Sequence, residues 1–237
     1  QLLDALHLAL QEAGVVGVSV PTWQALFARY HDAQRIRFGA LRVLNDDRVA
    51  PGMGFEEHPH DNMEILTYVL SGALAHQDSM GNTTVIKNGD IQVMSAGTGI
   101  QHSEYNKNQN ETVKFLQIWV FPNKKNVTPR YDQITLDKND RHNKLQQILS
   151  PNSEDEGVWI HQDAWFHMGD FENGKTATYT IKKSGNGVYA FVLKGQFTIN
   201  NTNLDRRDGL GLSGIDTIEI VATSDDASIL LMEVPMQ

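Results

Sequence analysis

After a helical beginning, the chain alternates short apolar runs with polar turns. An amphipathic helix is predicted over residues 2–13, where apolar residues recur at the spacing of one helix face: Leu2, Leu3, Leu6 and Leu10. A second helix is expected from Thr22 to about Tyr30, with Thr22 as its N-cap. Only short helices are therefore expected, and they lie near the N-terminus.

The rest of the chain has the pattern of antiparallel strands. Runs rich in Val, Ile, Leu, Tyr and Thr are separated by Gly, Asn and Asp, as in "FGALRVLND", "MEILTYVLSG", "TTVIKNGD", "IQVMSAGTG" and "VKFLQIWVFP". The turns "MGN" and "NGD" carry residues that accept positive φ. Short strands at this spacing predict an all-β sandwich or barrel.

The strand pattern occurs twice. A polar stretch with two prolines follows Trp119, and strand-like runs resume beyond it. "VLSGALAHQD" in the first half is echoed by "VLKGQFTINN" in the second, which favours an internal duplication. We expect an N-terminal helical extension and two β domains, divided as residues 1–21, 22–130 and 131–237.

Composition narrows the partners and the compartment. Of 237 residues, 40% are hydrophobic and 21% charged, which is typical of a globular protein. The net charge of −9 and the lack of a Lys- or Arg-rich stretch argue against nucleic acid or an anionic membrane as a partner. The chain has no cysteine, so a metal would have N and O ligands only, and this fits a reducing cytosol.

The apolar N-terminal segment does not have the features of a signal peptide. No basic region precedes it, and polar residues interrupt it at Asp4, His7, Gln11 and Glu12. No window approaches the roughly 18–20 apolar residues of a membrane span. The chain begins with Gln rather than Met, from which we expect a processed or truncated form. We predict a soluble, cytoplasmic protein.

Two pairs of metal-capable side chains are the most informative feature. His58 and His60 are spaced i, i+2 in "HPHDNME", and His102 and Glu104 have the same spacing in "GIQHSEYN". A β-strand sends alternate side chains to one face, so each pair can point at one spot. Two such strands facing each other would surround one ion with three imidazoles and a carboxylate. This donor set suits iron, manganese, nickel, copper, cobalt or zinc better than calcium or magnesium.

The residues around these pairs resemble the two motifs of the cupin superfamily. The first motif corresponds to Gly52, His58, Pro59, His60, Glu64 and Gly72, and the second to Gly89, Ser95, Ala96, Gly97, His102 and Asn106. Three details depart from the pattern: an extra residue before Gly72, Ser95 in place of proline, and a longer approach to His102. Within the cupins, the strings "FEEHPHDNMEILTYVLSG", "HQDSMGN" and "QVMSAGTGIQHSEYN" look like the pirin family and its bacterial quercetinase-like members. The resemblance runs from about Trp23 to Gln237.

The resemblance implies a bicupin, with two jelly-roll domains and a metal in the first domain only. Carried over by position, the ligands are His58, His60, His102 and Glu104, with Fe(II) as the favoured ion. Other cupins use the Glu of the first motif, which is Glu64 here. Strand alternation alone does not choose, because Glu64 shares parity with His60 if the strand runs unbroken. Glu64 therefore stays as an alternative ligand or a supporting carboxylate.

The resemblance also implies a reaction. Quercetinase-like pirins cleave the flavonol ring with O2, and Glu104 would then be both a ligand and the general base for the 3-hydroxyl. We expect a monomeric dioxygenase of the quercetin 2,3-dioxygenase type. The alternative is a metal-binding regulatory protein that docks on a partner without turnover, and a third possibility is an isomerase or small-metabolite binder.

The remaining histidines have no HxH partner. His161 and His167, in the second half, are expected in structural roles. Surface positions or local hydrogen bonds are expected for the others: His7, His31, His76 and His142.

Overall fold

The computed structural model describes residues 37–237. The predicted extension over residues 1–21 and the two predicted N-terminal helices lie outside the described residues. Within residues 37–237, no helix is long and apolar enough to cross a membrane. The described chain divides into two compact units, Leu41–Thr135 and Leu136–Gln237, and the second also includes Phe38–Ala40.

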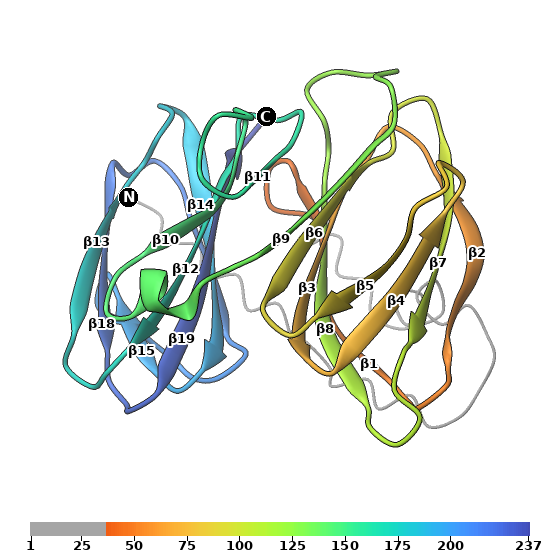
Figure 1. Cartoon of the computed structure of the whole chain (residues 1–237). Coiled ribbons are helices and arrows are strands. Elements are labelled where there is room, and N and C mark those ends of the chain that lie inside the picture. Colours follow the sequence, from red (N-terminus) through yellow and green to blue (C-terminus); the bar gives the residue numbers. More distant parts are fainter. Residues whose placement is uncertain (1–36) are drawn as a thin grey trace. The chain divides into compact units, whose positions relative to one another are not determined.

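The first unit contains two antiparallel sheets (Figure 1). The five-stranded sheet has the order β1-β8-β3-β6-β9, formed by Leu41–Val49, Val113–Val120, Glu64–Ser71, Asp90–Ser95 and Arg130–Thr135. The four-stranded sheet has the order β2-β7-β4-β5, formed by Gly54–His60, Ile100–Asn106, Ala73–Asp78 and Thr83–Lys87. Most neighbours in each sheet are distant in sequence, as in a jelly roll.

Two apolar clusters lie among the described residues of the first unit. One consists of Val49, Val69, Leu74, Ile86, Val113 and Phe115, and the other of Met63, Ile65, Met94, Ala96, Ile100 and Trp119. On β3, Ile65 belongs to one cluster and Val69 to the other, so Thr67 lies between them on the same face. By the same parity, the polar residues Thr67, Gln92, Glu104 and Gln117 form a buried band between the clusters.

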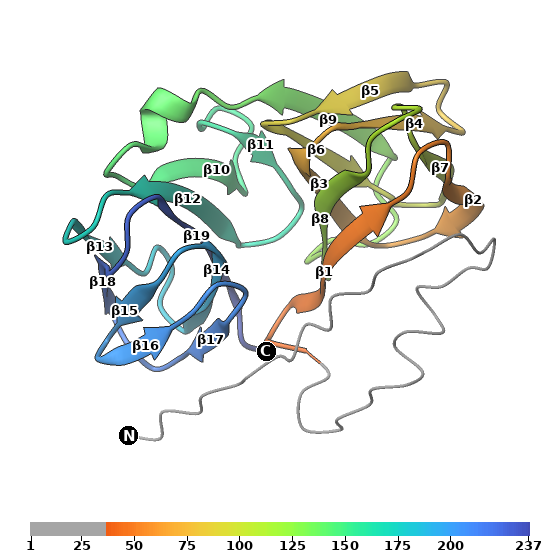
Figure 2. The same cartoon turned by 90° about the horizontal axis from the view of Figure 1, so that it is seen from below.

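The second unit also contains two sheets (Figure 2). The six-stranded sheet has the order β11-β10-β12-β19-β14-β17, formed by Val158–Trp159, Gln146–Ser150, Trp165–Phe171, Ala227–Pro235, Asn186–Lys194 and Gly209–Leu212. The four-stranded sheet has the order β13-β18-β15-β16, formed by Thr176–Thr180, Thr217–Ala222, Phe197–Ile199 and Thr202–Leu204. Among these strands only β10 and β11 pair in parallel. In the described part of the chain, the one helix is the 3-10 turn η1 at Lys138–Arg141. The predicted all-β, two-domain architecture is confirmed.

The domain boundaries differ in detail from those expected. β9 pairs with β6 along Arg130–Thr135, so these residues belong to the first unit although a boundary after residue 130 was expected. Phe38–Ala40 was expected in the first domain but groups with the second, because Ala40 N donates to Pro235 O at 2.8 Å and the Phe38 ring lies 5.7 Å from that of Tyr189.

A buried carboxylate organises one end of the second unit. Glu233 of β19 is fully buried, and it accepts hydrogen bonds from four groups: the Tyr179 hydroxyl at 2.6 Å, the Asn186 side chain at 2.9 Å and the backbone N–H groups of Lys182 and Lys183. These bonds tie β13, the turn after it and β14 to β19. Burial, together with the hydrogen bond to Glu233, raises the pKa of Tyr179, which therefore stays a donor.

We expect Glu233→Ala to lower the free energy of unfolding by about 3 kcal/mol, because it leaves several buried donors without an acceptor. Urea denaturation followed by tryptophan fluorescence measures the change. Glu219→Ala is the matched control, since Glu219 is an exposed carboxylate of β18 in the same unit. Equal stabilities of the two variants would contradict the role given to Glu233.

Candidate metal centre

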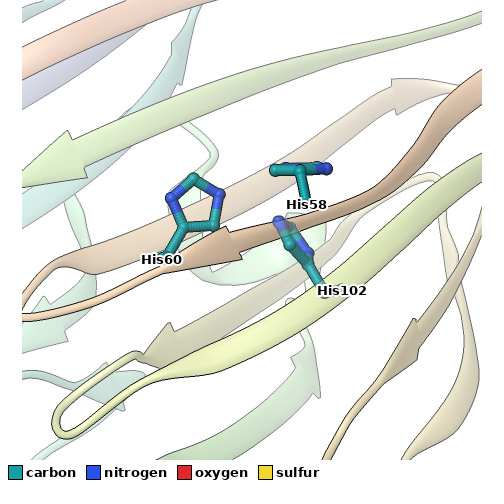
Figure 3. A group of neighbouring side chains, drawn as sticks. All are labelled: His58, His60 and His102. Carbon is teal, nitrogen blue, oxygen red and sulfur yellow. The ribbon is translucent and has the colours of Figure 1, made fainter.

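The two sequence pairs lie on neighbouring strands of one sheet. β2 and β7 pair antiparallel, and His58 is directly opposite His102. The sequence pattern predicted strands that face each other; instead the strands are hydrogen-bonded neighbours, and the two imidazoles form a cross-strand pair. Figure 3 shows His58 and His60 projecting from β2 beside His102 from β7.

The three imidazoles form a compact group. One ring nitrogen from each of His58, His60 and His102 lies within 4.8 Å of the other two. The ring centroids of His58 and His102 are 4.3 Å apart, and that of His60 lies 4.9 Å from His58 and 5.0 Å from His102. The structure therefore brings together three of the four residues in the predicted ligand set.

The hydrogen bonding of these rings fits a metal. His60 Nε2 and both nitrogens of His102 are buried and have no hydrogen-bond partner among the described residues. Buried polar atoms are nearly always paired, so these nitrogens fit an external ligand. His58 Nδ1 lies 2.8 Å from the backbone oxygen of Glu56, the kind of contact that orients a ligating imidazole.

The protonation state of His60 and His102 also fits metal binding. Burial, reinforced by the neighbouring His58, lowers the pKa of His60 to about 4 and that of His102 to about 2. Both rings are therefore neutral at pH 7, and the neutral imidazole is the form that binds a metal.

Glu104 lies deeper in the same domain. It is 2% exposed, and its Oε2 accepts a hydrogen bond from the Gln117 side chain at 2.8 Å while Oε1 accepts one from the Thr67 hydroxyl at 3.4 Å. Burial raises the pKa of Glu104. One Glu104 carboxylate oxygen and one nitrogen each from His102 and His76 all lie within 4.8 Å of one another. This second group does not contain His58 or His60. His102 thus belongs to both groups.

His76 is the residue that the sequence analysis missed. A surface position or a local hydrogen bond was expected, and the local bond exists, since His76 Nε2 lies 3.0 Å from Asp78 Oδ2. However, His76 is buried, and its Nδ1 has no hydrogen-bond partner among the described residues. The signal was the i, i+2 spacing of His76 and Asp78 in "ALAHQD", which places both on one face of β4.

Glu64 lies outside both groups of metal-capable residues. The strand does not run unbroken from His60 to Glu64: β2 ends at His60, Asn62 has a φ of +44°, and β3 begins at Glu64 in the other sheet. The parity argument for Glu64 therefore does not apply. Its carboxylate accepts a hydrogen bond of 2.6 Å from the Ser95 hydroxyl, a residue paired with it across β3 and β6.

The histidines of the second unit are not part of either group in the described chain. His167 of β12 is buried, with its ring 4.9 Å from that of Tyr179, and burial lowers its pKa to about 4. His161 contacts the Trp159 ring at 4.9 Å, and His142 is exposed. These positions agree with the structural roles expected for them.

An open pocket adjoins His60. It has a volume of about 640 Å³, and its walls are Pro59, His60, Asp61, Ser79, Gly99, Ile100 and Gln101. These residues come from the ends of β2 and β7 and from the turn after β4. A small molecule in this pocket would contact the His60 ring.

Comparison with known proteins agrees with this architecture. The Pirin family model matches residues 18–120, and the model of the quercetinase C-terminal cupin domain matches residues 147–234. The quercetin 2,3-dioxygenase of Escherichia coli K12 is 41% identical over 88% of each chain. A pirin-like protein of Caulobacter vibrioides is 40% identical over 87% of this chain and 88% of its own.

A solved structure of similar fold contains a metal. The crystal structure of the bacterial pirin YhhW from Escherichia coli in complex with nickel(II) has a TM-score of 0.83, with 40% identity over 89% of each chain. The resemblance found in the sequence motifs is confirmed by these matches across both units. The chain belongs to the pirin family of cupin proteins.

Proposed function

We propose that this protein is a metal-dependent dioxygenase of the quercetin 2,3-dioxygenase type, which cleaves a flavonol with O2 to a depside and carbon monoxide. The observation that carries the proposal is the group of three imidazoles beside an open pocket, in which His60 and His102 are neutral and have buried nitrogens without a hydrogen-bond partner among the described residues. Relatives about 41% identical are named for this reaction. Iron as the ion, a monomeric state and a cytoplasmic location stay predictions.

His58, His60, His102 and Glu104 are the proposed protein ligands of one transition-metal ion, favoured as Fe(II). When bound, the ion supplies Lewis acidity toward a substrate oxygen and redox chemistry toward dioxygen. The chain orients this set through the Glu56 backbone contact to His58 and the Gln117 and Thr67 bonds to Glu104.

The pocket would bind the substrate, and Glu104 would act as the general base. A flat flavonol would enter beside His60, where Pro59 and Ile100 offer apolar wall. Glu104 would accept the proton of the flavonol 3-hydroxyl at Oε1, whose contact with Thr67 is long. Because burial raises the pKa of this carboxyl, it is a stronger base than a carboxylate in water. Gln117 would hold the carboxylate in place through Oε2.

The direct test of the reaction is an oxygen-dependent flavonol assay on metal-analysed protein. We expect the purified protein to carry about one transition-metal ion and to bleach the flavonol absorbance only when O2 is admitted, with release of carbon monoxide. Protein that binds the ion but consumes no flavonol would contradict the dioxygenase proposal and favour the regulatory alternative.

His58→Ala tests the ligand set. We expect metal affinity to fall more than about 100-fold, because loss of an outer partner of a ligand alone costs about 10–100-fold. Flavonol consumption should disappear with the metal. The fold should persist, since His58 is only partly buried and lies on the edge strand β2. Elemental analysis and circular dichroism measure the two effects, with exposed His142→Ala as the control. Full metal content in His58→Ala would refute the assignment.

Glu104→Gln separates catalysis from binding. We expect the variant to retain part of its metal, because the imidazoles remain, while kcat falls about 10²–10⁴-fold through loss of the base. Glu64→Gln is the matched control, since Glu64 is equally buried and hydrogen-bonded but lies outside both groups. If Glu64→Gln lost metal and turnover while Glu104→Gln kept both, Glu64 would be the ligand instead.

A further inference from the structure

The second group of metal-capable residues includes a histidine that the proposed ligand set leaves out. We infer that His76 is a metal ligand, and that His76, His102 and Glu104 form an inner position for a divalent transition-metal ion. An ion at this inner position would not have His58 or His60 among its ligands. The inference rests on the proposed metal site only through the two shared residues, His102 and Glu104.

The register of three strands places these donors together. β7 lies between β2 and β4, and on β4 His76 is directly opposite Glu104 while Asp78 is directly opposite His102. One donor atom from each of His76, His102 and Glu104 lies within 4.8 Å of the others. All three residues are at most 2% exposed, so this group is less exposed to solvent than the outer group of His58, His60 and His102.

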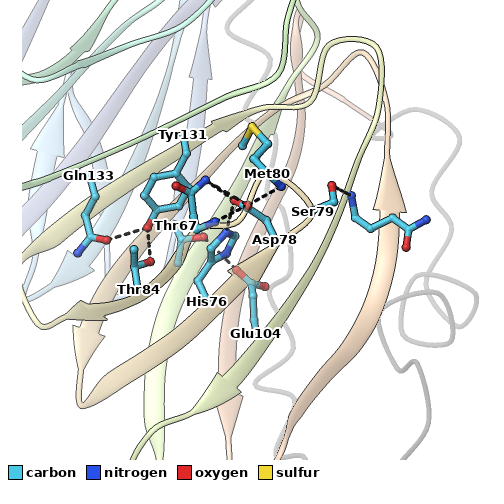
Figure 4. Close-up of polar contacts among 11 residues, drawn as sticks. Thr67, His76, Asp78, Ser79, Met80, Thr84, Glu104, Tyr131 and Gln133 are labelled. Carbon is cyan, nitrogen blue, oxygen red and sulfur yellow. Dashed lines mark hydrogen bonds and ion pairs between the residues drawn. The ribbon is translucent and has the colours of Figure 1, made fainter.

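The other nitrogen of His76 is held as ligating imidazoles usually are. Nε2 lies 3.0 Å from Asp78 Oδ2, and metal-bound histidines commonly donate their second ring N–H to a carboxylate. Asp78 is itself fixed, because Oδ1 accepts the backbone N–H groups of Met80 and Asn82 at 3.0 and 3.1 Å. Figure 4 shows His76 between Asp78 and Glu104.

The remaining nitrogen of His76, Nδ1, is buried with no hydrogen-bond partner among the described residues. Buried polar atoms are nearly always paired, and both nitrogens of His102 share this lack of a partner. A transition-metal ion held by His76, His102 and Glu104 would satisfy all three residues together.

Both nitrogens of His102 are buried and unpartnered, which fits a residue that serves two positions. The His102 centroid lies 4.3 Å from that of His58 and 5.4 Å from that of His76. The centroid of the His76 ring also lies 5.0 Å from that of the Tyr131 ring. The chain thus offers an outer position toward the pocket and an inner one toward the core.

Co(II) binding to the purified chain tests the inference. We expect a His58→Ala/His60→Ala double variant, isolated without its metal, to bind one equivalent of added Co(II) more weakly than the unaltered chain does, with a changed visible spectrum. Adding His76→Gln should weaken this binding by at least about 100-fold, since lost outer partners alone cost about 10–100-fold. Adding His167→Gln instead, at a buried histidine with an orphaned Nδ1 in the other unit, should leave it unchanged.

A measurement on the unaltered chain protects the test against misfolded variants. On addition of Zn(II), imidazole ¹⁵N NMR should show a shift of His76 Nδ1. An unmoved His76, or a double variant without Co(II) where the unaltered chain binds it, overturns the inner position and leaves the proposed function intact. An unaltered chain that binds neither Co(II) nor Zn(II) overturns both.

Discussion

The site depends on a buried polar band across the interior of the first unit. Burying such groups is costly unless each finds a partner, and most here do: Glu104 takes bonds from Thr67 and Gln117, and Gln117 Oε1 takes one from the Trp119 ring. Among the described residues of this unit, the buried side-chain atoms without a partner are Gln92 Oε1 and nitrogens of His60, His76 and His102. The apolar clusters lie on either side of the band, and a cation bound by these nitrogens would supply the partner that they lack.

The second unit shows the same architecture with the band removed. Its core is apolar along comparable strands, and its main buried carboxylate, Glu233, has all its partners within the chain. The echo between "VLSGALAHQD" and "VLKGQFTINN" makes the contrast specific: His76 corresponds to Ile199, which is fully buried in that core. At this strand position the second unit thus carries an apolar side chain where the first unit carries a buried imidazole.

Sequence alone predicted the fold and three members of the outer group, because strand parity is local and the i, i+2 pairs carry it. It did not predict that His58, His60 and His102 form one group while Glu104 joins His76 and His102 in another. Because β2 and β7 run antiparallel with His58 opposite His102, His60 lies opposite Ile100 on one side of that pair and Glu104 lies opposite Phe55 on the other, and strand parity does not reveal this register. His76 was missed for a related reason: its neighbours across the sheet, Glu104 and His102, follow from the β4–β7 register, which is a long-range property.

The order of the strands β2, β7 and β4 also determines how exposed each potential metal ligand is. β2 is an edge strand, so His58 and His60 are partly exposed and His60 borders the pocket. One strand inward, His102 is buried and shared by both groups. One strand further, His76 is also buried, with its ring next to that of Tyr131. Donors therefore become drier from the pocket toward the core, and electrostatic interactions strengthen in the same direction. The pocket beside His60 lies at the more exposed end of this order, and β7, which carries His102 and Glu104, lies between β2 and the strand of His76.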